Sequence, residues 1–560
     1  MDNGPQPSRE SLRLSTKLAY GAGDLGPAMT ANVLVFFLLY FFTNVAGLSA
    51  GLAGMVLAIG KISDAINDPI TGMLSDRTRS RWGRRIPWML GGIIPFGLLF
   101  FVQWLVPRFS GNPTTNEWLL FVYYVLIGIL FNLAFTAVNL PYTALTPELT
   151  QDYNERTSLN SFRMAFSIGG SILSLVLAQL IFALYPEEPQ RQYLALGELC
   201  AWVSIAATLW CCCRIQERHR QPLLPYALRH NGGYILAGLG GLAAIVGLAA
   251  VGQGAITLMI LRLLLLGLLS TAAGITLIFS QAESHLVAQH DPAQAVPRPA
   301  NAAQPPANPS PSNQPLGFGA QIKIAFATRP FLYVIGIYLC SWLAVQLTAS
   351  ILIYYVVSWI GLSESAFPQV AIAVQGTALV MLFVWQRLSD RWGKKQVYAL
   401  GTAIWIGAAI AIFWLQPGQI WQTYALSVLI GLGVSVAYLI PWSMVPDVIE
   451  LDELQTGQRR EGIFYGFMVL LQKVGLALAL FLVGQSLELA GFIRQLPGEP
   501  IQAQPETALL AIRIVMSAFP AIVLVGGLVL AYFYPITRVY HEEIRAQLAA
   551  RKAAAGELQS

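Results

Sequence analysis

Charged side chains are scarce in this 560-residue chain: Asp, Glu, Lys and Arg make up 11% of it, while 55% of the residues are hydrophobic. A soluble domain averages about 25% charged residues. A chain so poor in charge could not maintain a water-facing surface, so most of its exterior must face lipid. The composition excludes an ordinary soluble protein and predicts a membrane protein with the lipid bilayer as its surroundings.

Cysteine and histidine are also few, with five of each. The cysteines have neither the spacing of a zinc site nor that of a disulfide framework. The chain has no recognisable Ser/His/Asp arrangement and no phosphate-binding loop, so we expect no enzyme activity and no cofactor. Lys and Arg lie between apolar runs rather than on one patch, and nucleic acid is therefore not an expected partner.

Long apolar runs are abundant. A helix needs about 20 mostly apolar residues to cross the hydrocarbon core of a bilayer. The chain has two sets of six such runs. The first set lies near 25–46, 50–75, 86–106, 118–146, 162–184 and 192–213, and the second near 330–358, 366–388, 396–415, 421–446, 462–488 and 508–535.

Two more apolar stretches, about 233–251 and 255–280, separate the sets and bring the predicted count to 14 spans. A Pro-, Ala-, Asn- and Gln-rich segment follows them, and it has too few large apolar side chains to fold. The predicted organisation is a cytoplasmic N-terminus (1–18), a six-helix bundle (19–214), a cytoplasmic loop with two extra spans (215–290), a disordered linker (291–320), a second six-helix bundle (321–537) and a cytoplasmic tail (538–560).

Basic residues gather in alternate loops, and loops rich in Lys and Arg face the cytoplasm. The first 18 residues are polar and the first apolar run is too long for a signal peptide. Both termini are therefore predicted to be cytoplasmic, in a multi-pass protein of the plasma membrane (a bacterial inner membrane). The loops that carry this signal contain Arg77, Arg79, Arg81, Arg84 and Arg85; Arg214, Arg218 and Arg220; and Arg387, Arg391, Lys394 and Lys395.

An internal repeat joins the two sets of spans. LSDR at 74–77 leads to RWGRR at 81–85, and LSDR at 388–391 leads to WGKK at 392–395. Two spans later, PYTAL at 141–145 corresponds to PWSMV at 441–445. Internal repeats suit alternating access, in which two bundles move around a central site.

The repeated acidic and basic residues also predict gating charge clusters, one for each bundle. An Asp at a helix end beside Arg residues can form a latch that holds one conformation. The alternative is that the basic residues only set the orientation of the chain in the membrane. That would explain the number of arginines, but not the Asp beside them or the recurrence of the same word in the second half. The predicted gating residues are Asp76, Arg77, Arg84, Arg85, Asp390 and Arg391.

Ionisable residues inside a span are costly and are functional candidates. Asp64 and Asp68 are four residues apart in the second span, so they share one helix face, with Asn67 beside them. A small hard cation such as Na⁺, or a proton, would relieve their repulsion, and Thr136 could add a hydroxyl. The alternative is a solvated helix end, but Asp64 lies about 18 Å from Asp76 along the helix, too deep for the rim.

Two further charges lie in or beside spans. Lys473 needs a carboxylate partner, for which Asp64 or Asp68 is the natural choice; snorkelling to the membrane surface is the alternative. Arg163 could hydrogen-bond a substrate, or equally hold the rim through Glu148 or Asp152.

The opening KLAYGAGDLG at 17–26, the stretch 64–85 with its word DAINDP, and segments 141–163 and 462–473 resemble the glycoside-pentoside-hexuronide:cation symporters. This family, which includes melibiose permease, belongs to the major facilitator superfamily, and the resemblance covers the chain except about 215–320. It implies an all-α membrane protein of the major facilitator fold that carries a sugar or glycoside with Na⁺ or H⁺. It also implies that Asp64, Asn67, Asp68 and Thr136 form the cation site with Lys473 as its neighbour, and that Arg163 contacts sugar.

The chain departs from the family's sugar-binding pattern. Pro27 and Ala28 stand where melibiose permease has a Lys-Asp pair, and Asn139 and Thr143 replace its fourth-span Asp and its sugar-stacking Trp. A galactoside is therefore doubtful as the substrate. The predicted substrate-binding residues are Asp24, Phe135, Asn139, Tyr142, Thr143, Arg163, Tyr438 and Trp442, and for the aromatic ones packing between helices is an equally good explanation.

Two alternatives to a sugar symporter stay open. The animal sodium-coupled lysophospholipid carriers share the PYTAL word at 141–145, so a lysophospholipid or another amphipathic solute is one alternative. A non-transporting membrane receptor or scaffold is the other, although it would gain nothing from buried carboxylates. The expected partners are a small-molecule substrate and the coupling cation, and the expected state is a monomer.

Overall fold

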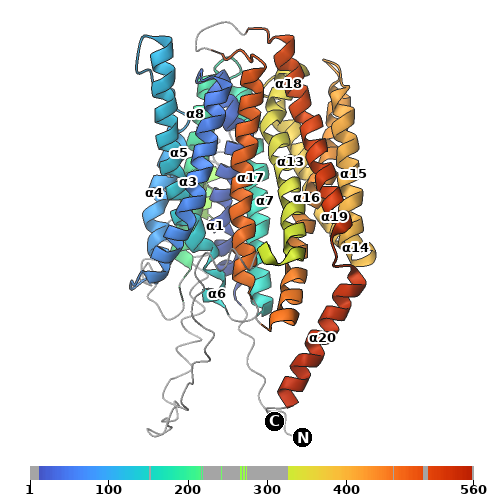
Figure 1. Ribbon diagram of the computed structural model, residues 1–560. Coiled ribbons are helices and arrows are strands. Elements are labelled where there is room, and N and C mark those ends of the chain that lie inside the picture. The colour runs from blue at the N-terminus through green and yellow to red at the C-terminus, as the bar shows by residue number, and fades with distance from the viewer. Residues whose placement is uncertain are drawn as a thin grey trace.

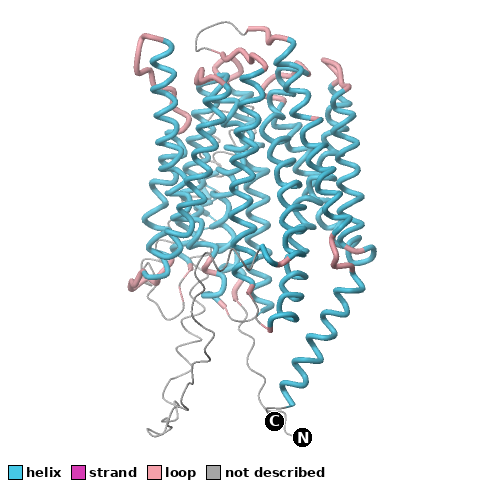
Figure 2. Tube along the Cα trace, in the orientation of Figure 1, coloured by secondary structure: helices cyan, strands magenta, loops and turns pink. Residues whose placement is uncertain are grey.

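The computed structural model describes residues 12–150, 153–215, 217, 326–457, 460–495 and 502–557, with a few single residues between 237 and 273. These residues form a bundle of long helices (Figures 1 and 2). The helices of the first half are α1 (Leu14–Val33), a π-helical turn η1 (Leu34–Leu38), α2 (Leu39–Asn44), α3 (Ala50–Arg77), α4 (Ile86–Val102), α5 (Pro113–Thr143), α6 (Thr146–Leu149), α7 (Tyr153–Leu184) and α8 (Pro189–Arg214). Those of the second half are α13 (Arg329–Tyr354), η3 (Tyr355–Trp359), α14 (Phe367–Trp392), α15 (Lys394–Phe413), α16 (Ile420–Thr456), α17 (Glu461–Leu489), α18 (Glu506–Met516), α19 (Ala518–Phe533) and α20 (Arg538–Glu557).

The helices confirm the two predicted sets of six spans. Ten helical segments among the described residues are long and apolar enough to cross a membrane. The charged α3 and the shorter α4 complete six spans in each half, with α1–η1–α2, α13–η3 and α18–α19 each counted as one. The predicted extra spans 233–251 and 255–280 lie largely outside the described residues, and the predicted linker 291–320 lies entirely outside them.

Local sequence explains two of the helix ends. Asn112 precedes α5, and its side chain accepts hydrogen bonds from the backbone N–H groups of Thr114 and Thr115 at 3.0 and 3.4 Å. These bonds satisfy donors that the first turn of a helix leaves free. Gly457 ends α16 with a φ of 71°, a left-handed conformation that glycine adopts without strain.

The two halves meet along a few helix pairs. Within the first half α1 packs against α7 and α8, and α4 packs against α5 and α8; within the second half α16 packs against α14 and α15. Contacts between the halves are made mainly by α3 with α17 and by α7 with α14. We call the end with the 78–85 loop and α20, at the bottom of Figure 1, the basic end, and the opposite end the far end.

Hydrogen bonds close the far end between the halves. Tyr40 donates to Glu364 at 2.8 Å, and the Thr43 hydroxyl lies 2.8 Å from the Tyr354 hydroxyl. The N–H of Gly51 donates to Glu488 at 3.1 Å, and Arg494 forms an ion pair with Glu117.

Glycines let α3 and α17 cross closely at that end. A Cβ on Gly484 would lie 2.6 Å from the Ala50 carbonyl oxygen and 2.7 Å from the Gly54 Cα. Any larger residue at 484 would therefore push the two halves apart.

Both chain ends contain more helix than predicted. The first span begins at Leu14, well before the predicted start near 25. Lys17 in this added segment forms an ion pair with Glu155 at 2.9 Å. The predicted tail 538–560 contains α20, which packs against α16. His541 of α20 lies 2.9 Å from a Glu450 oxygen and 3.4 Å from an Asp447 oxygen.

Candidate cation and substrate site

The two carboxylates predicted to share a face of α3 do so. Asp64 is 3% exposed, and the Thr136 hydroxyl of α5 lies 2.9 Å from Asp64 Oδ1 and 3.2 Å from Asp68 Oδ1. A single hydroxyl hydrogen can serve only one of these oxygens well at a time. Three side chains from two helices therefore form a compact set of oxygens inside the bundle, of the kind that hard cations prefer.

Lys473 joins this set from the other half of the molecule. Its Nζ lies 3.0 Å from Asp64 Oδ2 and 2.6 Å from Asp68 Oδ2. The lysine lies on α17 and the two carboxylates on α3, so the ion pairs cross the boundary between the halves. The prediction of a carboxylate partner for Lys473 is confirmed, and snorkelling to the membrane surface is excluded for this conformation.

The sequence prediction included one residue that is not part of this set and omitted two that lie beside it. Asn67 is half-buried, and its side chain makes no hydrogen bond to another described residue. Lys61, one turn before Asp64, instead lies 3.4 Å from the amide oxygen of Asn132 on α5. The i, i+3 spacing of Lys61 and Asp64 was a usable signal, because it places a second cation on the same helix face.

Carboxylate and hydroxyl oxygens are the ligands available here for an ion. Among the described residues no group of three or more His, Cys, Asp or Glu side chains gathers as a transition-metal site would require. Asp64 and Asp68 supply oxygens suited to Na⁺ or to a proton, and the Lys473 ammonium lies between them in the place of a cation.

Arg163 of α7 faces Asp24 of α1. Its Nε is 3.9 Å from Asp24 Oδ2 and is buried without a hydrogen-bond partner. The predicted alternative of a rim contact with Glu148 is wrong, because Glu148 pairs with Arg84 and Arg85. Asp152, the other rim candidate, lies outside the described residues. In this conformation the pair therefore leaves the Nε–H of Arg163 without a hydrogen bond.

Tyr142 is a packing residue rather than a binding residue. It is fully buried, its hydroxyl donates to the Tyr20 carbonyl oxygen at 2.6 Å, and its ring stacks on Tyr20 with centroids 5.1 Å apart. The prediction that Tyr142 contacts substrate is wrong for this conformation, since no surface remains for a ligand. Thr143 donates to the Leu140 carbonyl oxygen at 2.9 Å, and Asn139 is half-buried.

Of the other aromatic residues predicted to bind substrate, one is packed among rings of the first half and two are partly exposed in the second half. Phe135 packs against Phe96 and Phe131, with ring centroids 5.9 and 6.0 Å away. Tyr438 is 39% exposed and meets the edge of Trp342. The half-buried Trp442 stacks on Tyr465 at 6.1 Å and lies near Tyr338. The second half thus presents a wall of aromatic rings with hydroxyl and indole groups.

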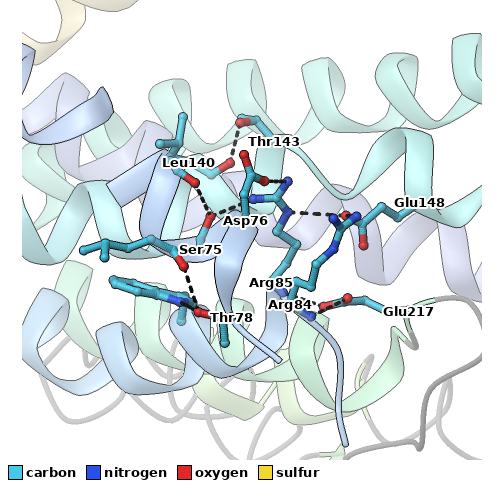
Figure 3. Close-up of polar contacts among 12 residues, drawn as sticks. Ser75, Asp76, Thr78, Arg84, Arg85, Leu140, Thr143, Glu148 and Glu217 are labelled. Carbon is cyan, nitrogen blue, oxygen red and sulfur yellow. Dashed lines mark hydrogen bonds and ion pairs between the residues drawn. The ribbon is translucent and has the colours of Figure 1, made fainter. Parts of the chain in front are cut away.

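Figure 3 shows the charge cluster at the basic end of the first half. Arg85 pairs with Asp76, and Arg84 pairs with Glu148 at 2.9 Å. Burial and the neighbouring Glu217 carboxylate raise the pKa of Glu148, against the opposing effect of the two arginines. This cluster joins α3, the 78–85 loop and α6, as a latch requires.

Glu217 was missed by the sequence prediction. Its carboxylate accepts hydrogen bonds from the backbone N–H groups of Arg84, Arg85 and Ile86 at 2.7, 2.7 and 2.9 Å. It thereby caps the start of α4 and holds the basic loop to the end of α8. A cap supplied from 131 residues away in the sequence leaves no local signal.

The equivalent cluster in the second half uses different residues from those predicted. Asp390 and Arg391 are exposed, and the ion pair is instead made by Lys394 with Asp447 at 2.7 Å. Lys394 and Asp447 are the repeat equivalents of Arg84 and Glu148. The Pro-acid pairs that follow PYTAL and PWSMV, Pro147-Glu148 and Pro446-Asp447, were therefore the better signal. Arg77 is likewise exposed, and forms no ion pair with a described residue.

Comparison with known proteins agrees with this architecture. The family model of the MFS/sugar transport proteins matches residues 19–228 and 241–538. A Synechocystis protein named an uncharacterized symporter is 57% identical over 97% of this chain and 98% of its own. The sodium-dependent lysophosphatidylcholine symporter 1-A of Danio rerio is 24% identical over 97% of this chain and 90% of its own.

Solved structures show the same fold at low identity. The nucleoside transporter NupG has a TM-score of 0.53 at 10% identity, covering 92% of this chain and 100% of its own. Two six-helix bundles around a buried charge site, with an internal sequence repeat, define a multi-pass membrane protein of the major facilitator fold. Within the major facilitator superfamily, the chain belongs to the family of MFS/sugar transport proteins.

Proposed function

We propose that this protein is a cation-coupled symporter in which Asp64 and Asp68 bind the coupling ion. The observation that carries the proposal is the position of Lys473, whose Nζ lies 3.0 and 2.6 Å from the two carboxylates. Groups so costly to bury are retained where they do work that a scaffold or receptor would not require. Na⁺ or H⁺ would take the place that the ammonium holds here.

Ion exchange at this site would couple to the movement of the halves. The lysine belongs to α17 and the carboxylates to α3, so an incoming cation that displaces Lys473 removes two ion pairs between the bundles. A ligand shifts a conformational equilibrium only through a difference in affinity for its states. The cation would have such a difference in affinity, because it competes with Lys473 for Asp64 and Asp68. The competition arises only in the arrangement of the bundles that brings Lys473 to the two carboxylates.

The orientation follows from charge. The arginine-rich loop 78–85 lies at the basic end, and loops rich in Arg and Lys face the cytoplasm. The hydrogen bonds between the halves, such as Tyr40 with Glu364, close the far end. This conformation therefore corresponds to a carrier closed toward the outside of the plasma membrane, with both termini in the cytoplasm.

Two substrate classes fit the site, and each has its own support. The family description favours a sugar or glycoside, which Arg163 and the aromatic wall at Tyr438 and Trp442 could bind. The full-length similarity to lysophosphatidylcholine symporters favours an amphipathic lysolipid, whose charged headgroup would lie between Arg163 and Asp24. Uptake into proteoliposomes across a panel of sugars, glycosides and lysolipids would separate them.

Substitution of Asp68 tests the coupling role. We expect Asp68→Asn to abolish accumulation driven by an imposed Na⁺ or H⁺ gradient, because the amide cannot hold a cation as a carboxylate does. Glu187→Gln, at an exposed position of the far-end loop, is the matched control and should accumulate substrate normally. Accumulation by Asp68→Asn at the wild-type level, in protein that inserts normally, would remove the coupling role.

A further inference from the structure

An apolar groove runs along the outside of the first half, between α4 and α5. It has a volume of 450 Å³ and is lined by Pro87, Trp88, Gly91, Gly92, Pro95, Leu99, Leu130, Leu133, Ala134 and Ala137. Small residues form its floor, and a Cβ on Gly91 would meet no atom within 4 Å. Helices α4 and α5 lie at the edge of the bundle (Figure 1), so the groove opens toward lipid.

The length and direction of the groove fit one lipid chain. It begins at Pro87, in the first turn of α4 at the basic end, and extends to Leu99. At 1.5 Å per residue this distance is about 18 Å, and one leaflet of a bilayer has a hydrocarbon depth of about 15 Å. Leu130 and Leu133, 46% and 45% exposed, form part of its outer wall. An acyl chain of the leaflet at the basic end can therefore lie along it.

Positive charge gathers at the mouth of the groove. The loop that leads into α4 contains the exposed Arg79 and Arg81, and exposed Arg77 precedes it. None of the three forms an ion pair with a described residue, whereas Arg84 and Arg85 are engaged by Glu148 and Asp76. The Arg81 guanidinium lies 4.8 Å from the Trp82 ring centroid and stays available to an anion.

Trp88 lies where the apolar lining meets this charge. Its Nε1 donates to the Thr78 hydroxyl at 2.7 Å, which orients the ring at the start of α4. Tryptophan is favoured at the membrane interface because its ring is apolar and its N–H is polar. The mouth thus combines an interfacial aromatic ring with arginines that form no ion pair within the described part of the chain.

We infer that this groove is a binding site for an anionic phospholipid of the basic-end leaflet, with one acyl chain between α4 and α5 and the phosphate at Arg79 and Arg81. The site is separate from the proposed substrate path, because α4 packs against α5 and α8 on the outer side of the first bundle. Bound lipid would hold the loop that also carries the Arg84–Glu148 pair. The inference does not rest on the proposed symport.

Retention of lipid by the purified full-length protein tests the site. Native mass spectrometry would count phosphatidylglycerol and phosphatidylcholine molecules bound after exchange into an equimolar mixture. We expect phosphatidylglycerol to be retained preferentially, and the double variant Arg79→Gln/Arg81→Gln to lose about fivefold of that preference for each arginine removed. Arg108→Gln, which removes an exposed arginine at the far end, is the control and should keep it.

The groove itself is tested by filling it. Gly91→Phe places a ring in open space and should remove the retained lipid, whereas Gly407→Phe on α15, also exposed with no atom within 4 Å of a Cβ, should not. Quenching of Trp88 fluorescence in the wild-type protein by brominated phosphatidylglycerol, with Trp88→Phe measured to subtract the signal of the other tryptophans, gives a second readout that does not depend on filling the groove. Equal retention of both lipids, unchanged retention by Gly91→Phe, or equal quenching by brominated phosphatidylcholine would each overturn the inference.

Discussion

At the scale of single residues, the site depends on charge balance around Lys473. Two carboxylates, Asp64 and Asp68, share this ammonium, and Lys61 lies one helical turn away. Removal of one partner from a buried ion pair costs about 3–5 kcal/mol because the other charge is left without compensation. A mobile cation can supply that compensation where a fixed lysine is missing.

Lys473→Gln should therefore make the stability of the protein depend on Na⁺. The variant keeps both carboxylates but loses their resident cation, so added Na⁺ has no competitor. At a concentration 100-fold above its Kd, a ligand that binds only the folded state stabilises it by about 2.7 kcal/mol. We expect Tm to rise with Na⁺ more steeply than in the wild type, measured by thermal unfolding against matched choline chloride.

A second substitution distinguishes this effect from general salt screening. Lys473→Gln combined with Asp68→Asn has only one carboxylate left at the site, and its Tm should again depend weakly on Na⁺. The idea would be lost if the double variant kept the steep dependence of the single one.

At the scale of helices, the α3–α17 crossing decides whether the far end can close. Gly484→Leu should open that end, because its side chain would meet the backbone of Ala50 and Gly54. Gly466→Leu is the matched control on the same helix, since a Cβ there meets nothing within 4 Å. Spin labels at Glu187 and Pro417, exposed on far-end loops of opposite halves, would report a longer distance for Gly484→Leu only.

The connection between η3 and α14 contains a carboxyl that should make closure of the far end pH-dependent. Glu364 accepts a hydrogen bond from Tyr40, and its Oε2 is buried without a partner. Among the described residues, the titratable groups that face it are the hydroxyls of Tyr40 and Tyr193, and Tyr354 packs against the Tyr40 ring. Burial raises the pKa of Glu364, and the hydrogen bond from Tyr40 opposes the rise only in part.

The sign of the effect follows from linkage. Opening the far end would return Glu364 to water and to an ordinary pKa near 4.3, so the closed state binds the proton more tightly. Closure is therefore most favoured at a pH below the pKa that Glu364 has in the open state. It weakens as the pH rises through the higher pKa that Glu364 has in the closed state. With the same spin labels we expect the open population to grow with pH, and Glu364→Gln to remove that dependence. A pH response that survives in Glu364→Gln would assign it to another group.

At the scale of the whole molecule, the two halves repeat in sequence but differ in how their basic-end pairs are buried. Arg84 is 46% exposed, and its partner Glu148 is also engaged by Arg85. Asp447 is 7% exposed in its side chain and pairs with Lys394, with His541 of α20 at 3.4 Å. The C-terminal helix thus adds to the second cluster a contact that has no equivalent in the first among the residues that the structure describes.

This asymmetry predicts unequal costs for equivalent substitutions. Lys394→Ala leaves the buried Asp447 carboxylate beside the His541 imidazole, which compensates it only when protonated, and should lower the free energy of unfolding by about 3 kcal/mol at a pH where the imidazole is neutral. Arg84→Ala should cost under about 1 kcal/mol, because the pair it removes is partly exposed and Arg85 remains. Thermal unfolding of the two variants in the same detergent checks the difference; equal losses would show that the two latches are equivalent.

The amino-acid sequence by itself determined what depends on local pattern. Runs of apolar residues defined the two sets of six spans, because a bilayer requires a minimum length of apolar helix. The four-residue spacing of Asp64 and Asp68 placed both carboxylates on one face, because the helix repeats every 3.6 residues. The repeated LSDR words predicted a charge cluster at the basic end of each half, although in the second half the ion pair is made by Lys394 and Asp447 rather than by Asp390 and Arg391.

Tertiary structure alone decided which distant side chains meet. The need of Lys473 for a carboxylate could be predicted from its charge, but its contact with both Asp64 and Asp68 was set by packing. Glu217 lies 131 residues from the N–H of Ile86 that it caps, and it was not predicted at all. Helix rotation and packing also decided that Tyr142 is buried against Tyr20. They decided equally that Lys394, and not Arg391, forms the ion pair of the second basic-end cluster. Such contacts arise from the way helices pack, to which residues far apart in the sequence contribute jointly, and no local pattern records them.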